Sequence, residues 1–440
     1  MSLRGRVLAV DGGCARKDRV RPFGLEDLRS QIQRYVSIDD IASMMAENPG
    51  RARNELKCAC RQSFEDSSWA SLSEDRRRTL VEQLVDEVFG FGPLQPLLAD
   101  DKVTEIMVNG PDSVYFERDG KLHRSDQRFA SVDQLRALID RILGPLGRRV
   151  DEASPLVNAR LPEGHRVHVV IPPLALDGPV MTVRKFTKRV MKLEDMVAQG
   201  SFDQVMRQCL VWAVCARKSI AVSGGTGSGK TTLLNALSCV LPQSERIITI
   251  EDSAELRFLE HPHVVRLEAR PRSAEGTGEV PIRELVINAL RMRPDRIVVG
   301  ECRGAEAIDM LQAMNTGHSG SLTTLHANSP ADVVSRLTTM VRYAVDLPVD
   351  VIESNVASAF DVVVQTTRSL DGRRFVSEVA ELEFDQERRR CEVHTLFKRE
   401  ASSDAGAWSA PPRWLEQLPR MGVADWKEVE RWRSMACLAA

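Results

Sequence analysis

The stretch Gly224-Gly225-Thr226-Gly227-Ser228-Gly229-Lys230-Thr231 decides the fold of this chain. It follows a short β-branched run at residues 219–223 and precedes an apolar periodic segment that begins at Thr232. A strand, a glycine-rich turn and a helix in this order are the setting of a phosphate-binding loop. The glycines let the backbone close around an anion, while successive N–H groups and the helix N-terminus supply partial positive charge. We therefore predict that residues 224–232 bind a nucleotide.

Two side chains of this stretch have specific expected roles. Lys230 is placed to reach the β- and γ-phosphates of a nucleotide, and the hydroxyl of Thr231 can bind Mg²⁺. The alternative is a chance glycine-rich turn, but a chance turn does not explain the strand before it and the helix after it. ATP and Mg²⁺ are therefore the expected ligands.

Length and composition indicate a globular protein of two or three domains. The 440 residues are 43% hydrophobic and 28% charged, and the net charge is −2. This balance argues against nucleic acid as a partner, although it does not exclude a local basic patch. The nine cysteines form neither a zinc pattern nor a disulfide framework, which indicates a reducing, cytosolic compartment. No run of about 18 apolar residues occurs, so we expect membrane association only through partners, without direct insertion.

Periodicity changes along the chain and predicts its organisation. Helical spacing of apolar residues between positions 25 and 89 predicts a helical region after a loose N-terminal arm. Thr104, Ile106 and Val108 then alternate with polar neighbours, which predicts a strand of an antiparallel sheet. We expect four segments: a helical region with its arm (1–75), a small α/β domain (76–190), a nucleotide-binding α/β domain (191–400) and a tail (401–440).

Two buried strands after the glycine-rich stretch deliver carboxylates. Glu251, Asp252 and Glu255 follow the first strand, and Glu301 ends the second. Open α/β sheets place their ligand sites past the carboxyl ends of their strands. A lone glutamate at a strand end is usually a surface residue, but acids after two parallel strands of one domain indicate groups that handle Mg²⁺ and water.

The histidines and arginines that we single out each allow two interpretations. His318 and His326 bracket a short strand, and they either sense the γ-phosphate or form structural hydrogen bonds. Arg166 and Arg184 flank two extended stretches, and they either project toward an anion or lie on a solvated, ion-paired face. For the arginines taken alone, the ion-paired face is the favoured interpretation.

The last segment of the chain is rich in tryptophan. Four of the six tryptophans are Trp408, Trp414, Trp426 and Trp432. Because large aromatic side chains bury extensive surface, we expect the tail to pack on the domain before it rather than to dock a partner.

Taken together, these motifs resemble the secretion ATPase superfamily of bacterial type II and type IV secretion and type IV pilus assembly. The sequence is most similar to the Tad/Flp pilus assembly branch, which is called CpaF-like. The phrases that carry the resemblance are Gly92-Pro-Leu-Gln-Pro-Leu-Leu98, residues 103–111, 151–155, 171–178 and 291–301, and the two-histidine segment. The resemblance covers about residues 80 to 400, and leaves the first 75 or so residues and the tail after Arg399 uncovered.

The resemblance implies a fold and a set of site residues. It implies a RecA-like motor domain with a phosphate loop, preceded by a PAS-like α/β domain, in a ring-shaped hexamer. Residues 224–232 would be the Walker A loop, Glu251, Asp252 and Glu255 would position Mg²⁺ and water, and Glu301 would orient or deprotonate the attacking water. His326, more than His318, would contact the γ-phosphate. Arg166 and Arg184 would reach the phosphates from the neighbouring domain, which reverses the interpretation favoured above. The sequence departs from the family pattern at Ser319 and Cys302, where an acidic residue and a valine are common.

The function implied is that of an ATP-hydrolysing motor. It would lie in the cytoplasm at the inner face of the bacterial inner membrane, work on a membrane platform protein, and power pilus assembly or type II-like protein secretion. One alternative is a type IV secretion ATPase that moves DNA or effector proteins, and another is a nucleotide-dependent ring with little turnover. The intact acids Glu251 and Glu301 argue against the ring, and the absence of a basic stripe argues against DNA as a direct substrate.

Overall fold

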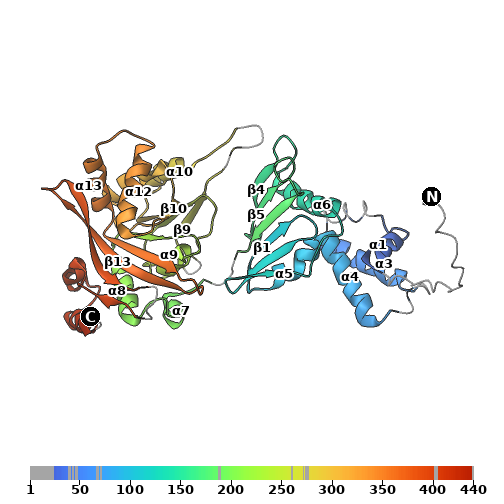
Figure 1. Cartoon of the computed structure of the whole chain (residues 1–440), viewed down its shortest axis with the longest axis horizontal. Helices are drawn as coiled ribbons and strands as arrows, with labels where there is room; N and C mark the ends of the chain where they lie inside the picture. Colours follow the sequence, from blue (N-terminus) through green and yellow to red (C-terminus); the bar gives the residue numbers. More distant parts are fainter. Residues whose placement is uncertain are drawn as a thin grey trace, which may run out of the picture. The chain divides into compact units, whose positions relative to one another are not determined.

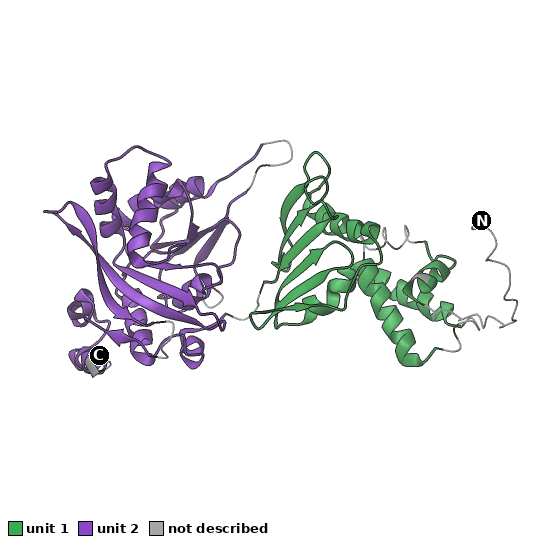
Figure 2. Cartoon of the chain, viewed as in Figure 1, with its two compact units in different colours: residues 1–185 green, residues 186–440 purple. Residues whose placement is uncertain are grey.

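The structure is a computed structural model that describes residues 24–438. It leaves out residues 38–40, 42–43, 45–47, 66–68, 70–71, 187–189, 259–260, 271, 273–276 and 401–404. The chain divides into two compact units, residues 1–185 and 186–440 (Figure 2). The loose arm that the sequence suggested lies outside the described residues up to position 23.

The first unit begins with helices, as the apolar spacing predicts. They are α1 (Leu25–Ile32), α3 (Pro49–Ser63) and α4 (Glu74–Phe89) (Figure 1). The side chain of Asn48 accepts a hydrogen bond at the start of α3, and that of Ser73 does so at the start of α4, so both helices have polar N-caps. The three helices share a core that includes the fully buried Trp69. Helix α4 spans the segment boundary expected at residue 75.

The rest of the first unit is a six-stranded antiparallel sheet. The order is β3 (Lys121–Arg124), β2 (Val114–Arg118), β1 (Val103–Asn109), β6 (Val180–Arg184), β5 (Arg166–Val170), β4 (Leu156–Arg160). Its accompanying helices are η2 (Gly92–Leu94), α5 (Gln95–Ala99), α6 (Val132–Leu143) and η3 (Gly144–Leu146). The antiparallel sheet confirms the prediction, with one correction in β1. Val103, not Thr104, is buried with Ile106 and Val108, because the pairing register shifts between Val103 and Glu105 and such a shift changes which side chains face the core.

The second unit is built on one nine-stranded sheet. The order is β15 (Ala407–Trp408), β14 (Arg390–Lys398), β13 (Arg374–Asp385), β12 (Val362–Arg368), β7 (Ile220–Gly224), β11 (Leu322–Leu325), β10 (Arg296–Cys302), β8 (Ile247–Glu251), β9 (Val264–Glu268). The strands from β12 to β9 in this order run parallel, while β13, β14 and β15 pair antiparallel. The unit therefore has a mixed α/β fold.

Helices cover both faces of this sheet. Ile220 and Val222 of β7 belong to one apolar cluster and Ala221 to another, because successive side chains of a strand point to opposite faces. The first cluster includes α7 (Leu193–Ala198), α8 (Gln204–Cys215), α9 (Lys230–Ser238), η5 (Arg413–Gln417), α14 (Leu418–Met421) and α15 (Trp426–Leu438). The second includes α10 (Ile282–Ala289), η4 (Leu290–Met292), α11 (Glu306–Asn315), α12 (Pro330–Arg342) and α13 (Val349–Ala359). Among the described residues, no helix has both the length and the apolar character needed to cross a bilayer.

The tryptophan-rich tail packs against the second unit, which confirms the prediction. Trp432 is 1% exposed, and its ring lies 4.9 Å from that of Trp408 and 6.4 Å from that of Trp212. Its Nε1 donates a hydrogen bond to the carbonyl of Val205, 2.8 Å away. Trp414 is also buried, whereas Trp426 is exposed. The tail is therefore part of the core of this unit.

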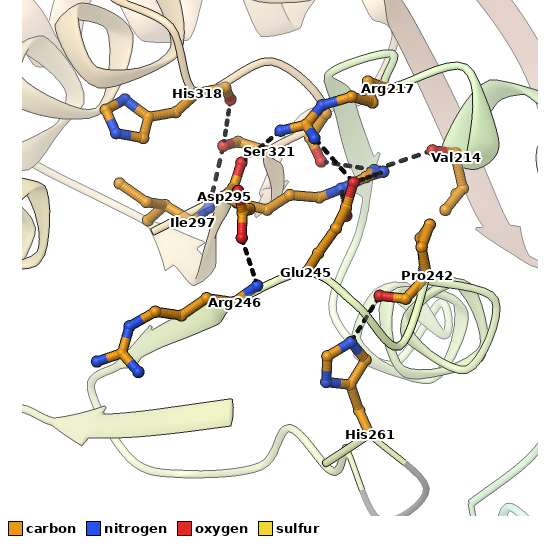
Figure 3. A network of polar contacts seen from close by, with 12 residues as sticks. Val214, Arg217, Pro242, Glu245, Arg246, His261, Asp295, Ile297, His318 and Ser321 are labelled. Atoms are coloured by element: carbon orange, nitrogen blue, oxygen red, sulfur yellow. Dashed lines mark hydrogen bonds and ion pairs between the residues drawn. The ribbon is translucent and has the colours of Figure 1, made fainter. Parts of the chain in front are cut away.

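A buried ionic network closes the amino-terminal edge of the parallel strands (Figure 3). Arg296, the first residue of β10, is fully buried and donates to the carboxylate of Glu245. It also donates to the carbonyls of Val214, at 2.9 Å, and Gly320, at 3.2 Å. Arg217 adds a second ion pair to Glu245 at 2.8 Å. The buried guanidinium of Arg296 therefore links the start of β10 to three separate parts of the chain, at Val214, Glu245 and Gly320.

Candidate functional site

The sequence-predicted residues gather at the carboxyl edge of the parallel strands. The glycine-rich loop, which we define as residues 224–231, follows β7, and His326 follows β11. Glu251 ends β8, and Glu301 lies next to the end of β10. Because these strands run parallel and are neighbours in the sheet, their carboxyl ends meet at one edge.

The glycine-rich loop turns tightly between β7 and α9. Gly224 has φ +154°, and a Cβ there would overlap the carbonyl oxygen of Thr366 in the neighbouring β12; only glycine fits this approach. Helix α9 starts at Lys230 with Gly229 as its N-cap, so the first backbone N–H groups of α9 face the loop. The loop therefore has the strand–turn–helix geometry that suits a phosphate anion.

Lys230 is buried and turned back onto the loop. Its Nζ donates to the carbonyls of Gly224 at 3.0 Å and Gly225 at 2.8 Å. Burial lowers the pKa of the Lys230 ammonium, and the nearby Glu301 carboxylate partly offsets that effect. An anion in the loop would give this ammonium a charged partner in place of two neutral carbonyls, which makes the exchange favourable.

Glu301 lies in a bulge of β10. Val299 pairs with Thr323 and Cys302 with Leu325 in β11, so β10 has one extra residue between these pairs. A bulge re-aims the side chains beside it, and here Cys302, not Glu301, joins the apolar cluster. The bulge therefore turns the Glu301 carboxylate away from the apolar core on this side of the sheet.

A chain of charged and polar groups connects Glu301 to Lys230. Oε1 of Glu301 lies 2.9 Å from Nε2 of His326, and Nδ1 of His326 lies 3.5 Å from Nζ of Lys230. On the other side, Arg303 donates to Oε2 of Glu301 at 2.7 Å. The order Lys230, His326, Glu301, Arg303 places one carboxylate and one imidazole between two cations.

The electrostatics of this chain set the charge of each group. Burial alone would raise the pKa of Glu301, but the hydrogen bond and charge of Arg303, with His326 and Lys230, lower it below its ordinary value. Burial and the charge of Lys230 lower the pKa of His326 despite the opposing effect of Glu301. At neutral pH, Glu301 is therefore ionised and His326 is neutral.

Glu251 is held differently from Glu301. Its Oε1 accepts hydrogen bonds from the backbone N–H groups of Glu255 at 2.6 Å and Leu256 at 2.8 Å. A Cβ on Gly300 would lie 2.8 Å from Cγ of Glu251, so β10 can approach this side chain only with glycine at that position. Burial raises the pKa of Glu251 to about 7, although the two N–H groups lower it in part. Glu251 thus closes the turn after β8, while Asp252 beside it is exposed.

The residues at this edge suit a Mg²⁺ ion that arrives together with a nucleotide. Among the described residues, no three histidine, cysteine, aspartate or glutamate side chains are grouped so as to hold a metal ion. Mg²⁺ in nucleotide sites keeps several waters and binds one or two protein groups besides the phosphates. Thr231 lies in the first turn of α9, and Oε2 of Glu251 is buried without a hydrogen-bond partner. These two oxygens fit an ion that a nucleotide brings with it, and not a carboxylate cage.

His318 is not part of this cluster, which corrects its expected grouping with His326. It precedes β11 and therefore lies at the amino-terminal edge (Figure 3), whereas His326 follows the strand. Its ring contacts the carbonyl of Ala313 at 2.9 Å, and its own carbonyl accepts a hydrogen bond from Ser321 at 2.7 Å. Of the two interpretations left open, the structure shows hydrogen bonds within the fold for this histidine.

Arg166 and Arg184 lie in the first unit, side by side. Arg166 of β5 pairs in register with Arg184 of β6 and, on its other side, with Arg160 of β4. Directly opposite residues of neighbouring strands point to the same face. The sheet therefore carries a row of three arginines, of which sequence reasoning singled out only two.

Sequence reasoning also missed three residues beside the glycine-rich loop. Arg303 lies two positions after Glu301, and this short spacing between an acid and an arginine is a signal that could have identified it. Thr366 and Arg374 contact the loop from β12 and β13. No local pattern points to them, since they are far from the loop in the sequence.

A glycine-rich loop between a parallel strand and a helix, with acids on neighbouring strand ends, is typical of α/β proteins that bind mononucleotides. The chain belongs to the type II/IV secretion system protein family, whose model matches residues 87–402. It is 40% identical over 332 residues to a putative conjugal transfer protein from Mycobacterium tuberculosis, covering 74% of this chain and 93% of the relative. It is 34% identical over 323 residues to the type IV secretion system protein VirB11 of Brucella suis, covering 66% of this chain and 89% of the relative. The crystal structure of the Brucella suis VirB11 ATPase with sulphate matches with 31% identity and a TM-score of 0.37, covering 69% of this chain and 96% of that one.

Proposed function

We propose that this protein is an ATP-hydrolysing motor that powers assembly of a Tad/Flp-type pilus or a related type II-like protein secretion. The observation that carries the proposal is the chain of Lys230, His326, Glu301 and Arg303 beside the glycine-rich loop. Family membership supports it, as does the word ATPase in the name of the related Brucella protein. In this proposal the second unit is the RecA-like motor domain, and the antiparallel sheet of the first unit is the PAS-like domain.

The residues have distinct roles in the proposed hydrolysis. Lys230 leaves the loop carbonyls and binds the β- and γ-phosphates, while the N–H groups of residues 224–232 surround them. Glu301, kept ionised by Arg303, orients the attacking water and accepts its proton. The neutral imidazole of His326 lies between Lys230 and Glu301, where it meets the γ-phosphate. A bound Mg²⁺ held by Thr231 and Glu251 would neutralise phosphate charge, with Asp252 and Glu255 at its water shell.

A motor must also couple hydrolysis to movement, and in this proposal two arginines of the first unit do so. We propose that Arg166 and Arg184 of the first unit bind the γ-phosphate, so that triphosphate binding draws the two units together and hydrolysis releases them. The subunits would act in a homohexamer in the cytoplasm, on a platform protein of the bacterial inner membrane. Replacing Arg166 or Arg184 by alanine should then lower ATP turnover about 10³-fold. Arg124→Ala, at an exposed position on β3, is the control, and full activity in both site variants would remove this clamp.

The hydrolytic site has a direct test in ATP turnover and ATP binding of the full chain. Lys230→Ala should lose both, whereas Glu301→Gln should keep binding and lose turnover by about 10²-fold or more, as removal of a general base does. Glu284→Gln makes the same chemical change at an exposed position on α10 and should leave both unchanged. Normal hydrolysis in Lys230→Ala and Glu301→Gln together would place the reaction elsewhere.

A second candidate function is type IV secretion, in which the motor moves DNA or effector proteins. The observation that favours it is the naming of the relatives, one as a putative conjugal transfer protein and one as VirB11. Single-stranded DNA should leave the ATPase rate unchanged if the first proposal holds, and strong stimulation would favour the second. Identification of the membrane protein that purifies with the hexamer separates pilus assembly from effector secretion.

A further inference from the structure

We propose that the hairpin of β12 and β13 forms a second, cationic wall of the nucleotide site. In this inference Arg374 positions the glycine-rich loop, and Arg374 and Arg368 together bind the polyphosphate of a nucleoside triphosphate. The inference rests on the proposed function, since it assigns a further part of the same nucleotide site. It is independent of the arginines of the first unit.

The root of the hairpin is fixed to the glycine-rich loop. Thr366 of β12 pairs in register with Gly224, and its Oγ1 donates to the carbonyl of Ser223 at 3.0 Å. The hydroxyls of Thr366 and Ser228 lie 2.8 Å apart in a buried hydrogen bond. These contacts join the end of β12 to both the start and the middle of the loop, so they fix the position of the loop against the hairpin.

Two arginines reach the rim of the loop from this hairpin. Nε of Arg374 donates to the carbonyl of Gly227 at 2.8 Å. A Cβ on Gly229 would lie 3.6 Å from Cδ of Arg374, and a Cβ on Gly227 would lie 3.3 Å from Nη1 of Arg368. The stem of Arg374 therefore covers the last glycine of the loop, and both arginines lie where the loop opens.

The pairing of these arginines with each other indicates an anionic ligand. Arg368 and Arg374 are direct partners across the antiparallel pair of β12 and β13, so their side chains share one face. Two guanidinium groups on one face add positive charge at the rim of the loop, which favours an anion there. The fork of donors on a guanidinium matches phosphate oxygens in particular. The ligand class that fits is therefore a polyphosphate lying along the rim of the loop.

The bond to Gly227 also prepares the loop for that ligand. A charged donor on a carbonyl polarises its peptide group, and the N–H of the same peptide belongs to Ser228, inside the glycine-rich loop. Charge-assisted hydrogen bonds are stronger than neutral ones and hold geometry better. In this structure the N–H of Ser228 donates to the carbonyl of Gly225 at 3.4 Å, so Arg374 acts on the phosphate through its charge and on the loop through the peptide that it holds.

The hairpin supplies a matched control one residue away. Arg373 donates through Nε to Asp371 at 2.6 Å, within a turn closed by the bond from the N–H of Ser369 to the carbonyl of Arg373 at 2.9 Å. Arg373 therefore lies in this turn, just before β13 begins at Arg374. Arg373→Ala and Arg374→Ala therefore remove the same charge from the same hairpin, and the second also removes the hydrogen bond to the carbonyl of Gly227.

The test is equilibrium binding of ADP and of a non-hydrolysable ATP analogue to the full chain, measured by calorimetry at low and high salt. Arg374→Ala should weaken binding about tenfold or more, the loss expected for one charge-assisted hydrogen bond, and Arg368→Ala should weaken it less. Arg374→Lys should recover the part that depends on charge, and this recovered part should shrink at high salt. Arg373→Ala should bind within about threefold of the wild type.

The outcomes separate this inference from the proposed function. If the wild type binds nucleotide and Arg373→Ala and Arg374→Ala weaken binding equally, the effect comes only from the net charge of the hairpin, and the inference is overturned. Normal nucleotide binding in both Arg374→Ala and Arg368→Ala would also overturn it. No nucleotide binding by the wild type itself would overturn the proposed function. Unchanged tryptophan fluorescence of each variant shows that the second unit remains folded.

Discussion

Replacing Glu251 by glutamine is expected to remove a pH-dependent loss of stability from the second unit. The carboxyl is 3% exposed, and its pKa rises from 4.5 to about 7 on folding. The folded state therefore holds a proton between these two values that the unfolded state has released, so stability falls as the pH rises from 4.5 to 7. At about 1.4 kcal/mol for each pH unit, the loss is about 3 kcal/mol above pH 7 and absent below pH 4.5.

Glutamine keeps the oxygen that accepts the N–H groups of Glu255 and Leu256, and it carries no charge. Its amide adds buried N–H donors where Oε2 has no partner, which gives an offset that is the same at every pH. The informative quantity is therefore the change with pH in the difference between the two unfolding free energies. From pH 5 to pH 8 that difference should move by about 3 kcal/mol in favour of Glu251→Gln.

Urea unfolding between pH 5 and pH 8, followed by tryptophan fluorescence, measures this difference. Five of the six tryptophans lie after residue 186, so the signal reports mainly on the second unit. Glu284→Gln, at its exposed position, should follow the wild type at every pH. If the Glu251→Gln and wild-type curves stay parallel across this range, the carboxyl is ionised in the folded protein and the reasoning is refuted.

Three further perturbations have defined outcomes. Arg303→Ala should lower ATP turnover more than it raises KM, because Arg303 positions Glu301 rather than the nucleotide; Arg303→Lys should restore part of the rate, and a change in KM alone would contradict this role. Trp432→Ala should lower the unfolding free energy of the second unit by about 3–5 kcal/mol in urea titrations, since it empties a fully buried site. Glu245→Ala should cost about 3–5 kcal/mol in the same titration because it leaves Arg296 buried without its carboxylate partner; a loss below 1 kcal/mol would show that the pair is not needed.

The central parallel strands of the second unit could be predicted because they are short, mainly apolar and buried. Strands β7 and β8 are buried along their whole length, and an apolar run between turn residues identifies such strands without any alternation. The order of the strands could not be predicted in this way. The contact of Thr366 with Ser223 joins residues 143 positions apart, and no local pattern carries that information. The bulge in β1 was missed for a similar reason, since alternation alone makes Thr104 a core residue.

Residues of the candidate site could be predicted where they lie at, or just after, the carboxyl end of a strand. Glu251, Glu301 and His326 follow from that rule, and the same rule would have separated His318, because it precedes its strand. Arg374 was beyond prediction, since its role depends on which strand becomes the neighbour of β7. Long-range pairing is therefore the part of this site that a single sequence does not contain.

The buried network of Arg296 has a consequence for how this unit responds to a ligand. The guanidinium fixes the first residue of β10, and Glu301 lies next to the last residue of the same strand. Sliding β10 past its neighbours would strip a buried cation of its partners, a penalty of about 3–5 kcal/mol. The buried ion pair thus opposes sliding of β10, and we expect the movements that accompany nucleotide exchange to occur in the connections beyond its carboxyl end.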